Sequence, residues 1–371
     1  MDINIIRYFF IFNIINFVLF LTDFFESHLP AFIKRSTFSY GKFNVKMPSI
    51  IATKFEVPKR WFRHYYIFSA PLMTISLYLI LRTCLHNVDV PQIMFTALDT
   101  SLGTSRKLLI SAEDTILAIV IYNIHCWKRL YESYYVNIFS DQKQNIYFYI
   151  IALIHYVSLT LSILGESQGF VKGSCGNMHL HKITIVKLVC VLVCLWSIYV
   201  QLKTNFILAK LRKNIHGDIV SLKYKIPFGG LFKYVSSPLC LCEVLIYIML
   251  SAILWQASTY HYVTLWVITN QGYSAYITHQ WYNKTFKNYP KERKILIPYI
   301  CMTVLGMYTR TAMMRLNIVR AILSPPRFDM RDEGYAINEY KAKGKWNYYE
   351  CIMYVANSSV FRRECTMIKL L

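Results

Sequence analysis

Charged residues are scarce in this chain, and acidic residues are the scarcest of them. Of the 371 residues, 16% are charged, and Asp and Glu number 20 against 41 Lys and Arg. Hydrophobic residues make up 55% of the chain, and the mean hydropathy is +0.33. So apolar a composition exceeds the balance of soluble domains and predicts an all-α, polytopic membrane protein.

Several familiar site signatures are missing as well. There is no GxGxxG after a strand and no GxxxxGK[ST], which excludes the Rossmann and P-loop ways of holding a nucleotide. Among the ten cysteines, Cys190 and Cys194 would share one helix face, and Cys240 and Cys242 form a C-x-C pair. Neither has a second pair at zinc-finger spacing, so we predict no metal. No nucleic-acid motif is present, and we therefore assign the excess positive charge to membrane topology and anionic lipid headgroups.

Long apolar runs dominate the chain instead. A transmembrane helix needs about 20 mostly apolar residues. The first run lacks a strong basic segment before it and a small-residue cleavage site after it, so we interpret it as a span rather than a signal peptide. Seven spans are predicted, at residues 4–25, 65–85, 108–124, 146–164, 183–202, 239–256 and 260–279.

The loops between these runs alternate in positive charge. Loops after the first, third, fifth and seventh runs are rich in Lys and Arg, whereas 86–107 and 165–182 are poorer. The positive-inside rule then places the basic loops and the C-terminus in the cytosol and the N-terminus in the lumen. Arg106 and Lys107 are the exception to this pattern. The sequons at Asn283 and Asn357 would face the cytosol and carry no sugar.

Ionisable residues inside the apolar runs are candidate functional residues, because burying a charge in lipid is costly. Glu243 lies in the sixth run, Glu113 and Asp114 in the third and Lys187 in the fifth. The alternative is an interfacial side chain that reaches the headgroups. That alternative suits Lys187 better than Glu243, whose side chain is short.

Two further groups of polar residues lie at the predicted cytosolic ends of spans. Gln201, Asn205 and Arg212 are spaced close to whole helical turns, so they are expected to share one helix face. Such a stripe suits a ligand with phosphate or amide groups, or is an ordinary solvated helix end. His279 and Tyr282 either contact a ligand or belong to an interfacial aromatic belt.

Five segments with these residues resemble the steroid 5-alpha-reductase family, and specifically its polyprenol reductase branch. The branch is indicated by IPFG with YVSSP, and by SAYITHQWY where steroid enzymes carry a His-rich version. The resemblance covers roughly residues 28 to 300 and leaves the tail 301–371 unmatched. We expect the tail to be disordered or to form weak helices at 302–323 and 345–356. The segments are FEVPKRWFRHYYIFS at 55–69, HCWKRLYESYYVNIFS at 125–140, KTNFILAKLRKN at 203–214, KIPFGGLFKYVSSPLCLCEVLIYIML at 225–250 and SAYITHQWYNKTFKNYPKERKILIPYI at 274–300.

This resemblance implies a domain over 1–300, with 226–300 its most diagnostic part, in which seven helices surround a cofactor cavity. It implies an endoplasmic-reticulum reductase that uses NADPH and acts on a long polyisoprenoid in dolichol synthesis. The cofactor-binding residues it implies are Arg129, Gln201, Asn205, Arg212, Glu243, Tyr282 and Arg293.

Hydride adds poorly to an isolated alkene and readily to one conjugated with a carbonyl, so we expect the aldehyde polyprenal to be the true acceptor. A donor must then meet the carbonyl oxygen, where negative charge grows, and Glu113 and His279 are the candidates.

The chain also departs from the family pattern. Leu239 follows YVSSP where the family usually has Asn, and Cys126 stands where steroid enzymes have a catalytic Tyr. Leu239 has no side-chain donor or acceptor. Two alternatives therefore stay open: a steroid 3-oxo-5-alpha 4-dehydrogenase, and a reductase-derived membrane scaffold with impaired catalysis.

Overall fold

The computed structural model describes residues 2–20, 56–176, 178, 179, 181 and 183–297, with only the backbone described at 18–20. These residues belong to one compact unit, Met1–Met314. The predicted helices at 302–323 and 345–356, and the sequon at Asn357, lie outside the described residues.

Within the described ranges the fold is helical, with one small β-ribbon. The helices are α1 (Ile5–Phe20), α5 (Phe62–His86), α6 (Gln92–Leu102), α7 (Ala112–Tyr131), α8 (Ile146–Leu164), α9 (Ile185–Lys210), α10 (Pro238–Ile253) and α11 (Tyr260–Thr285). The strands β1 (Glu56–Pro58) and β2 (Lys143–Asn145) pair antiparallel, with Glu56 opposite Asn145. Short helical turns occupy Lys59–Trp61, Glu132–Val136 and Gly230–Lys233.

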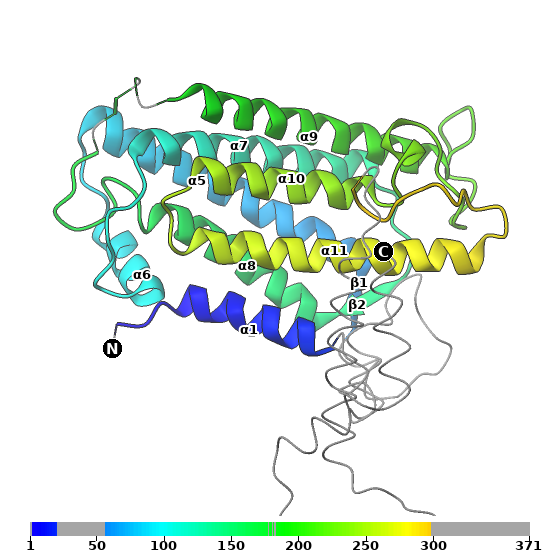
Figure 1. The fold of residues 1–371 in the computed structure, drawn as a ribbon, viewed down its shortest axis with the longest axis horizontal. Coiled ribbons are helices and arrows are strands. Elements are labelled where there is room, and N and C mark those ends of the chain that lie inside the picture. Colours follow the sequence, from blue (N-terminus) through cyan, green and yellow to red (C-terminus); the bar gives the residue numbers. More distant parts are fainter. Residues whose placement is uncertain (1, 21–55, 177, 180, 182, 298–371) are drawn as a thin grey trace, which may run out of the picture. The chain divides into compact units, whose positions relative to one another are not determined.

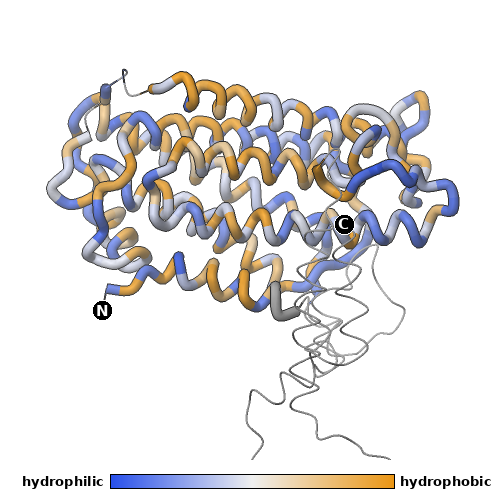
Figure 2. The backbone as a smooth tube through the Cα atoms, in the orientation of Figure 1, coloured by the Kyte–Doolittle hydropathy of each residue, from blue (hydrophilic) through white to orange (hydrophobic). Residues whose placement is uncertain are grey.

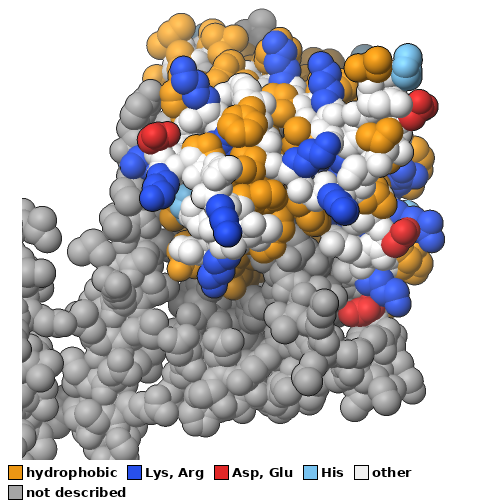
Figure 3. All heavy atoms as spheres, turned by 90° about the vertical axis from the view of Figure 1, so that its right-hand side faces the viewer, with side chains coloured by type: hydrophobic (Ala, Val, Ile, Leu, Met, Phe, Trp, Pro, Cys, Tyr) orange, Lys and Arg blue, Asp and Glu red, His pale blue; other side chains and the backbone are white. Residues whose placement is uncertain are grey.

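The long helices lie alongside one another, and the short α6 lies at one end (Figure 1). Helix α10 packs against both α9 and α11, α7 packs against α5, and α1 packs against α11. The β-ribbon and the C-terminal end of α11 lie together at the opposite end from α6 (Figure 1). We call this the basic end, because Lys and Arg side chains are scattered over its face and outnumber the acidic ones there (Figure 3).

The sequence explains where several helices begin. The side chain of Ser111 accepts a hydrogen bond from the backbone N–H of Asp114, which caps α7, and Glu113 and Asp114 complement the positive end of the helix dipole. Lys128 and Arg129 do the same for its last turn. Pro238 stands at the start of α10, where its missing N–H costs no hydrogen bond.

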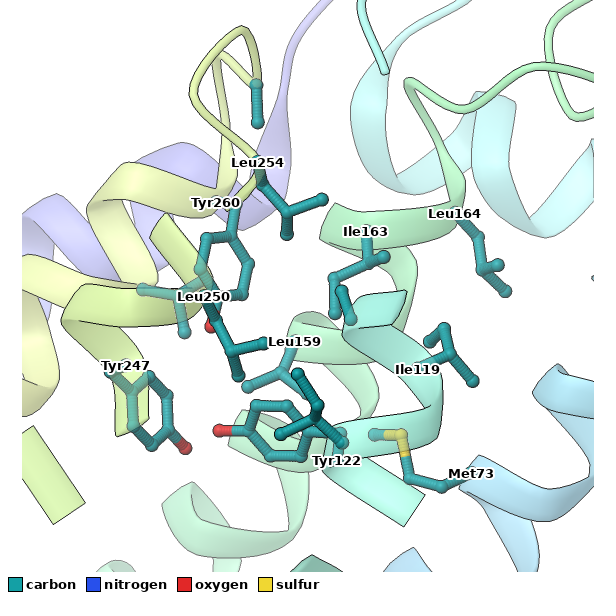
Figure 4. Packing of buried hydrophobic residues seen from close by; sticks show 14 of the residues in the cluster. Met73, Ile119, Tyr122, Leu159, Ile163, Leu164, Tyr247, Leu250, Leu254 and Tyr260 are labelled. Carbon is teal, nitrogen blue, oxygen red and sulfur yellow. The ribbon is translucent and has the colours of Figure 1, made fainter. Parts of the chain in front are cut away.

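The core is apolar and draws on most of the long helices. Met73 of α5, Ile119 of α7, Leu159 of α8 and Leu250 of α10 meet there with their side chains fully buried (Figure 4). A smaller cluster of Val235, Leu241, Val244, Ala275 and Leu296 joins α10 to α11 near the basic end.

Hydrophobic residues occupy much of the length of the helices (Figure 2), and several large ones, among them Ile185, Leu192 and Tyr199 of α9, are exposed. Three helical segments among the described residues are long and apolar enough to cross a membrane, namely Lys59–His86, Ile146–Leu164 and Ile185–Lys210. The helices Ile5–Phe17 and Pro238–Ile253 are apolar but shorter. These features fit a membrane protein, while the count of seven spans stays a prediction.

Two features of the fold differ from the sequence prediction. The segment 86–107 was expected to be a loop, yet it contains α6, whose apolar run is too short to indicate a helix by length. The β-ribbon is a departure from an all-α fold.

The contacts of Arg106 explain why a cation lies in the otherwise cation-poor segment 86–107. It donates to Asp99 Oδ1 at 2.6 Å and to the carbonyl oxygens of Gly165 at 2.7 Å and Phe170 at 2.8 Å. Its charge is therefore neutralised inside the protein rather than offered to the membrane surface.

Candidate functional site

Glu243 lies at the centre of a polar cluster formed by three helices. Its position in the second turn of α10 directs the carboxylate towards α7 and α9. Its Oε2 accepts a hydrogen bond from Gln201 Nε2 of α9 at 2.7 Å, and its Oε1 lies 3.4 Å from His125 Nε2 of α7. Lys128 Nζ donates to Gln201 Oε1, which fixes the orientation of that amide. Glu243 is thus held from two sides.

A second carboxylate, that of Glu132, lies in the helical turn that follows α7. Glu132 is fully buried, and its Oε2 lies 2.6 Å from Arg129 Nη1 and 3.4 Å from Lys128 Nζ. Arg129 also donates from Nε to the Tyr66 hydroxyl at 3.1 Å. The predicted cofactor residue Arg129 is therefore part of an ion-paired cluster within the protein. A dense set of charges out of water needs such pairing, since each unpaired charge would be costly.

The predicted polar stripe on α9 is only partly a helix face. Gln201 and Asn205 lie on α9 with 2% and 5% of their surface exposed. The Nδ2 of Asn205 is buried and meets no hydrogen-bond acceptor among the described residues. The helix ends at Lys210, so Arg212 lies in the turn after it, and the expectation of one continuous helical stripe does not hold there.

Arg212 is held by the loops of the basic end. Its Nη1 donates to the carbonyl oxygen of Ile138, and its guanidinium lies 5.6 Å from the centre of the Tyr224 ring. Lys59 lies within electrostatic reach of it. No carboxylate in the described part of the chain pairs with either cation, so the two together attract an anion.

The end of α11 and the segment after it form an aromatic layer. His279 Nδ1 lies 2.6 Å from Ser236 Oγ, to which the Tyr289 hydroxyl also donates at 2.7 Å. The rings of Tyr282 and Tyr289 stack with their centres 5.1 Å apart. These contacts bring the predicted residues His279 and Tyr282 into one group with the YVSSP segment.

Arg293 is the buried cation of this layer. Only 4% of its surface is exposed, and its guanidinium lies 4.9 Å from the Phe228 ring centre and 5.2 Å from that of Tyr289. Its Nη1 has no acceptor within the described ranges. A buried guanidinium that lies against two ring faces and has an unpartnered Nη1 in the described part of the chain is suited to binding an anion.

Glu113 is remote from this cluster. It lies in the first turn of α7, where it is 2% exposed and accepts from the backbone N–H of His179. Twelve residues separate it from His125 on the same helix, or about 18 Å at the rise of an α-helix. The structure therefore brings His279 and Glu243 to the basic end and leaves Glu113 at the other.

His125 and Glu132 are the residues of this site that sequence reasoning missed. Lys59 and Lys128 entered it only among the cations of the basic loops after the first and third predicted spans. All four lie in segments that carry the family resemblance, but no spacing rule sets them apart. Their significance comes from contacts between elements far apart in the chain.

A groove of about 420 Å³ lies elsewhere, along the second half of α5. It is lined by Tyr78, Leu81, Arg82, His86 and Val88, none of which belongs to the Glu243 cluster. Among the described residues, no group of His, Cys, Asp or Glu is arranged to hold a metal ion.

Fold and contacts together define a helical membrane protein with a largely buried acid–base cluster at its basic end. Comparison with known proteins identifies its family. The family described as 3-oxo-5-alpha-steroid 4-dehydrogenase matches residues 163–301. A polyprenal reductase of Drosophila melanogaster is 32% identical over 286 residues, which are 76% of this chain and 87% of that protein.

Two further relatives agree. A polyprenal reductase of Caenorhabditis elegans is 33% identical, over 71% of this chain and 85% of its own length. A polyprenal reductase of Homo sapiens is 31% identical, over 70% of this chain and 84% of its own length. The chain therefore belongs to the polyprenal reductases of the steroid 5-alpha-reductase family, and it is an oxidoreductase that acts on a CH–CH double bond.

Proposed function

We propose that this protein uses NADPH to reduce the α-isoprene double bond of polyprenal, a step of dolichol synthesis in the endoplasmic-reticulum membrane. The observation that carries the proposal is the Glu243 cluster, a carboxylate held between α7 and α9 in a chain similar to polyprenal reductases over most of its length. The name of these relatives also agrees with the chemical expectation that the acceptor is the conjugated aldehyde.

The basic end suits a dinucleotide with phosphate and amide groups. The Asn205 Nδ2, the Ser237 Oγ and the Arg293 Nη1 are buried polar atoms that lack partners among the described residues. Burying such atoms without hydrogen bonds costs about 1–3 kcal/mol each, so their presence favours a polar ligand. Arg212, Lys59 and Arg293 would hold the phosphates, and Gln201, Asn205 and Glu243 would hold the amide-bearing part. When bound, NADPH supplies the hydride.

The carbonyl of an enal needs a hydrogen-bond donor, because negative charge grows on its oxygen as hydride adds to the β-carbon. Of the two predicted donors, His279 lies at the same end as Glu243, in contact with Ser236. We assign the donor role to His279. Glu113 lies about 18 Å from His125 along α7. At that opposite end of the bundle it accepts a hydrogen bond from the backbone N–H of His179.

The test is a reduction assay with purified protein, NADPH, and either polyprenal or polyprenol of the same length. We expect turnover of the aldehyde and little of the alcohol. Equal turnover of the two would remove the argument from conjugation, and no turnover of either would reject the reductase assignment. An enone of the testosterone type belongs in the same assay, because the match to a steroid dehydrogenase family over 163–301 favours it as the second candidate.

Arg212→Ala tests the cofactor site. Loss of a guanidinium facing an anion is expected to raise the KM for NADPH about tenfold or more and to leave the KM for polyprenal unchanged. Lys223→Ala is a matched control, since this exposed cation lies in the same loop. An unchanged KM for NADPH in Arg212→Ala would contradict the assignment.

The proposed orientation places the basic end in the cytosol. Asn283 is exposed at the end of α11 on that side. We expect the protein from cells to carry no glycosidase-sensitive mass at Asn283, and a glycan found there would reverse the orientation.

A further inference from the structure

His125 of α7 is a buried histidine beside Glu243 that is not among the residues proposed to contact the cofactor or the substrate. Only 1% of its surface is exposed, and its ring lies edge to face with Tyr122 at 5.9 Å between centres. Its Nε2 faces Glu243 Oε1 at 3.4 Å, longer than an ordinary N–H···O hydrogen bond. Catalytic contacts are often long before ligands bind and shorten in the complex.

Contact with a carboxylate decides which nitrogen carries the proton. An ionised carboxylate only accepts hydrogen bonds, so the ring nitrogen facing it, Nε2, must be the donor. In the neutral ring Nδ1 is then an acceptor, and it has no partner among the described residues. His125 therefore has one nitrogen directed at Glu243, and its other nitrogen has no hydrogen-bond partner among the described residues.

The other oxygen of Glu243 is fixed from the opposite side. Gln201 of α9 donates to Oε2, and the oxygen of Gln201 in turn accepts from Lys128. Because Lys128 and His125 are both on α7, that helix orients Glu243 directly through the histidine and indirectly through the amide. Together these contacts prevent the carboxylate from turning, and each oxygen retains a lone pair.

We propose that His125 is a positioning residue that aims the Glu243 carboxylate at the carboxamide N–H of the nicotinamide. This inference rests on the proposed function, in which Glu243 contacts the amide-bearing part of NADPH. A carboxamide donates two hydrogen bonds in its own plane, so it binds well only to an acceptor held in that plane. His125 contributes by restricting Glu243 before the cofactor arrives, which lowers the entropy lost on binding.

Two substitutions at position 125 separate the hydrogen bond from packing. His125→Phe keeps a ring of similar size and removes the donor. His125→Gln places an amide N–H near the position of Nε2. We measure the Kd of NADPH without substrate by fluorescence quenching, and the KM of each substrate. The phenylalanine variant should bind NADPH about tenfold more weakly, with unchanged KM for polyprenal, and the glutamine variant should recover most of the affinity.

A double-mutant cycle with Glu243→Gln decides whether His125 acts through Glu243. If it does, His125→Phe costs little further affinity once Glu243 is gone, and the coupling between them accounts for most of its effect. His155→Phe is the matched control, because His155 is a buried histidine of the same core whose contact is the Tyr247 hydroxyl at 2.8 Å. It should leave the Kd of NADPH unchanged.

The outcomes are distinct. Additive losses in the cycle, no effect of His125→Phe, or an equal effect of His155→Phe would each overturn the role of His125 while the reductase assignment stands. If the wild type reduces polyprenal but binds NADPH no more tightly than His125→Phe does, the role of His125 is likewise overturned and the reductase assignment stands. Wild-type protein that binds no NADPH would overturn both.

Discussion

Each end of the helix bundle contains a carboxylate enclosed by helices, and the two carboxylates differ in how many hydrogen bonds they accept. Glu166 has 4% of its surface exposed, whereas the side chain of Glu243 is 17% exposed. Glu166, between α8 and α9, accepts from the backbone N–H of Ser258 at 2.7 Å and from the hydroxyls of Ser258 at 2.5 Å and Thr259 at 2.8 Å. Glu243, at the basic end, accepts one normal hydrogen bond, from Gln201, and has a longer approach from His125.

The surroundings of the two carboxylates extend this difference. Near Glu166, the Arg106 guanidinium meets Asp99 and two backbone carbonyls, while the Nε of Arg7, which donates from Nη2 to Ser258, has no partner among the described residues. At the basic end, polar atoms of His125, Asn205 and Arg293 are buried without partners among the described residues. A carboxylate that accepts from several protein donors stabilises the fold, whereas one with fewer donors can still accept from a ligand. We therefore expect mutations at the two ends to affect different properties.

Glu243→Gln should have the largest effect, and the effect should be on activity. The amide cannot offer two anionic acceptors to the cofactor, so kcat/KM for NADPH is expected to fall about 100-fold. The melting temperature should stay close to that of the wild type, since the amide oxygen of the new side chain can still accept the hydrogen bond from Gln201. A normal kcat/KM together with a lowered melting temperature would make Glu243 a structural residue like Glu166.

Glu166→Gln should show the opposite pattern. The amide oxygen cannot satisfy all the donors that the carboxylate meets, and stability is expected to fall by about 2 kcal/mol. Thermal unfolding in detergent measures this loss. The folded fraction should keep the wild-type KM for NADPH, and a raised KM would show that the two ends are coupled.

Asp99→Asn should have the smallest effect, a change in the melting temperature that is seen only at acidic pH. Hydrogen bonds from Lys172 and Arg106 hold the pKa of Asp99 below its usual range. A lowered folded-state pKa stabilises the protein above the ordinary carboxyl pKa of about 3.9, and this stability is lost as the pH falls through the folded value. The melting temperature of the wild type should therefore fall more between pH 5 and pH 3 than that of Asp99→Asn.

Asp89→Asn is the control for the acid measurement, because Asp89 is exposed in the loop that precedes α6. It should follow the wild type at every pH. Identical pH dependence of the wild type and Asp99→Asn would mean that the ion pair with Arg106 does not stabilise this end.

Much of the helical framework could be predicted from the apolar runs. The predicted span 146–164 coincides with α8, and 239–256 overlaps α10 closely. The predicted helix boundaries were wrong where a capping residue or a polar segment decides where the helix begins or ends. Helix α7 begins at Ala112 after the Ser111 cap rather than at residue 108, and α11 continues to Thr285 through a polar segment.

The candidate site was only partly visible in the sequence. A carboxylate inside an apolar run singled out Glu243, and i, i+4 spacing placed Gln201 and Asn205 on one face of α9. Neither rule could pair Glu243 with His125, because that contact requires α7 to lie beside α10. Spacing also misled at Arg212, since the helix ends before it reaches that residue.

The sequence by itself determined that this is a basic, apolar, helical chain of the reductase family, because composition, periodicity and motifs are local properties. Only the tertiary structure decided which buried polar groups meet. Helix packing gives the Glu166 carboxylate several donors from Ser258 and Thr259, just before α11, and gives the Glu243 carboxylate fewer, and that difference depends on distances between elements that no local pattern encodes.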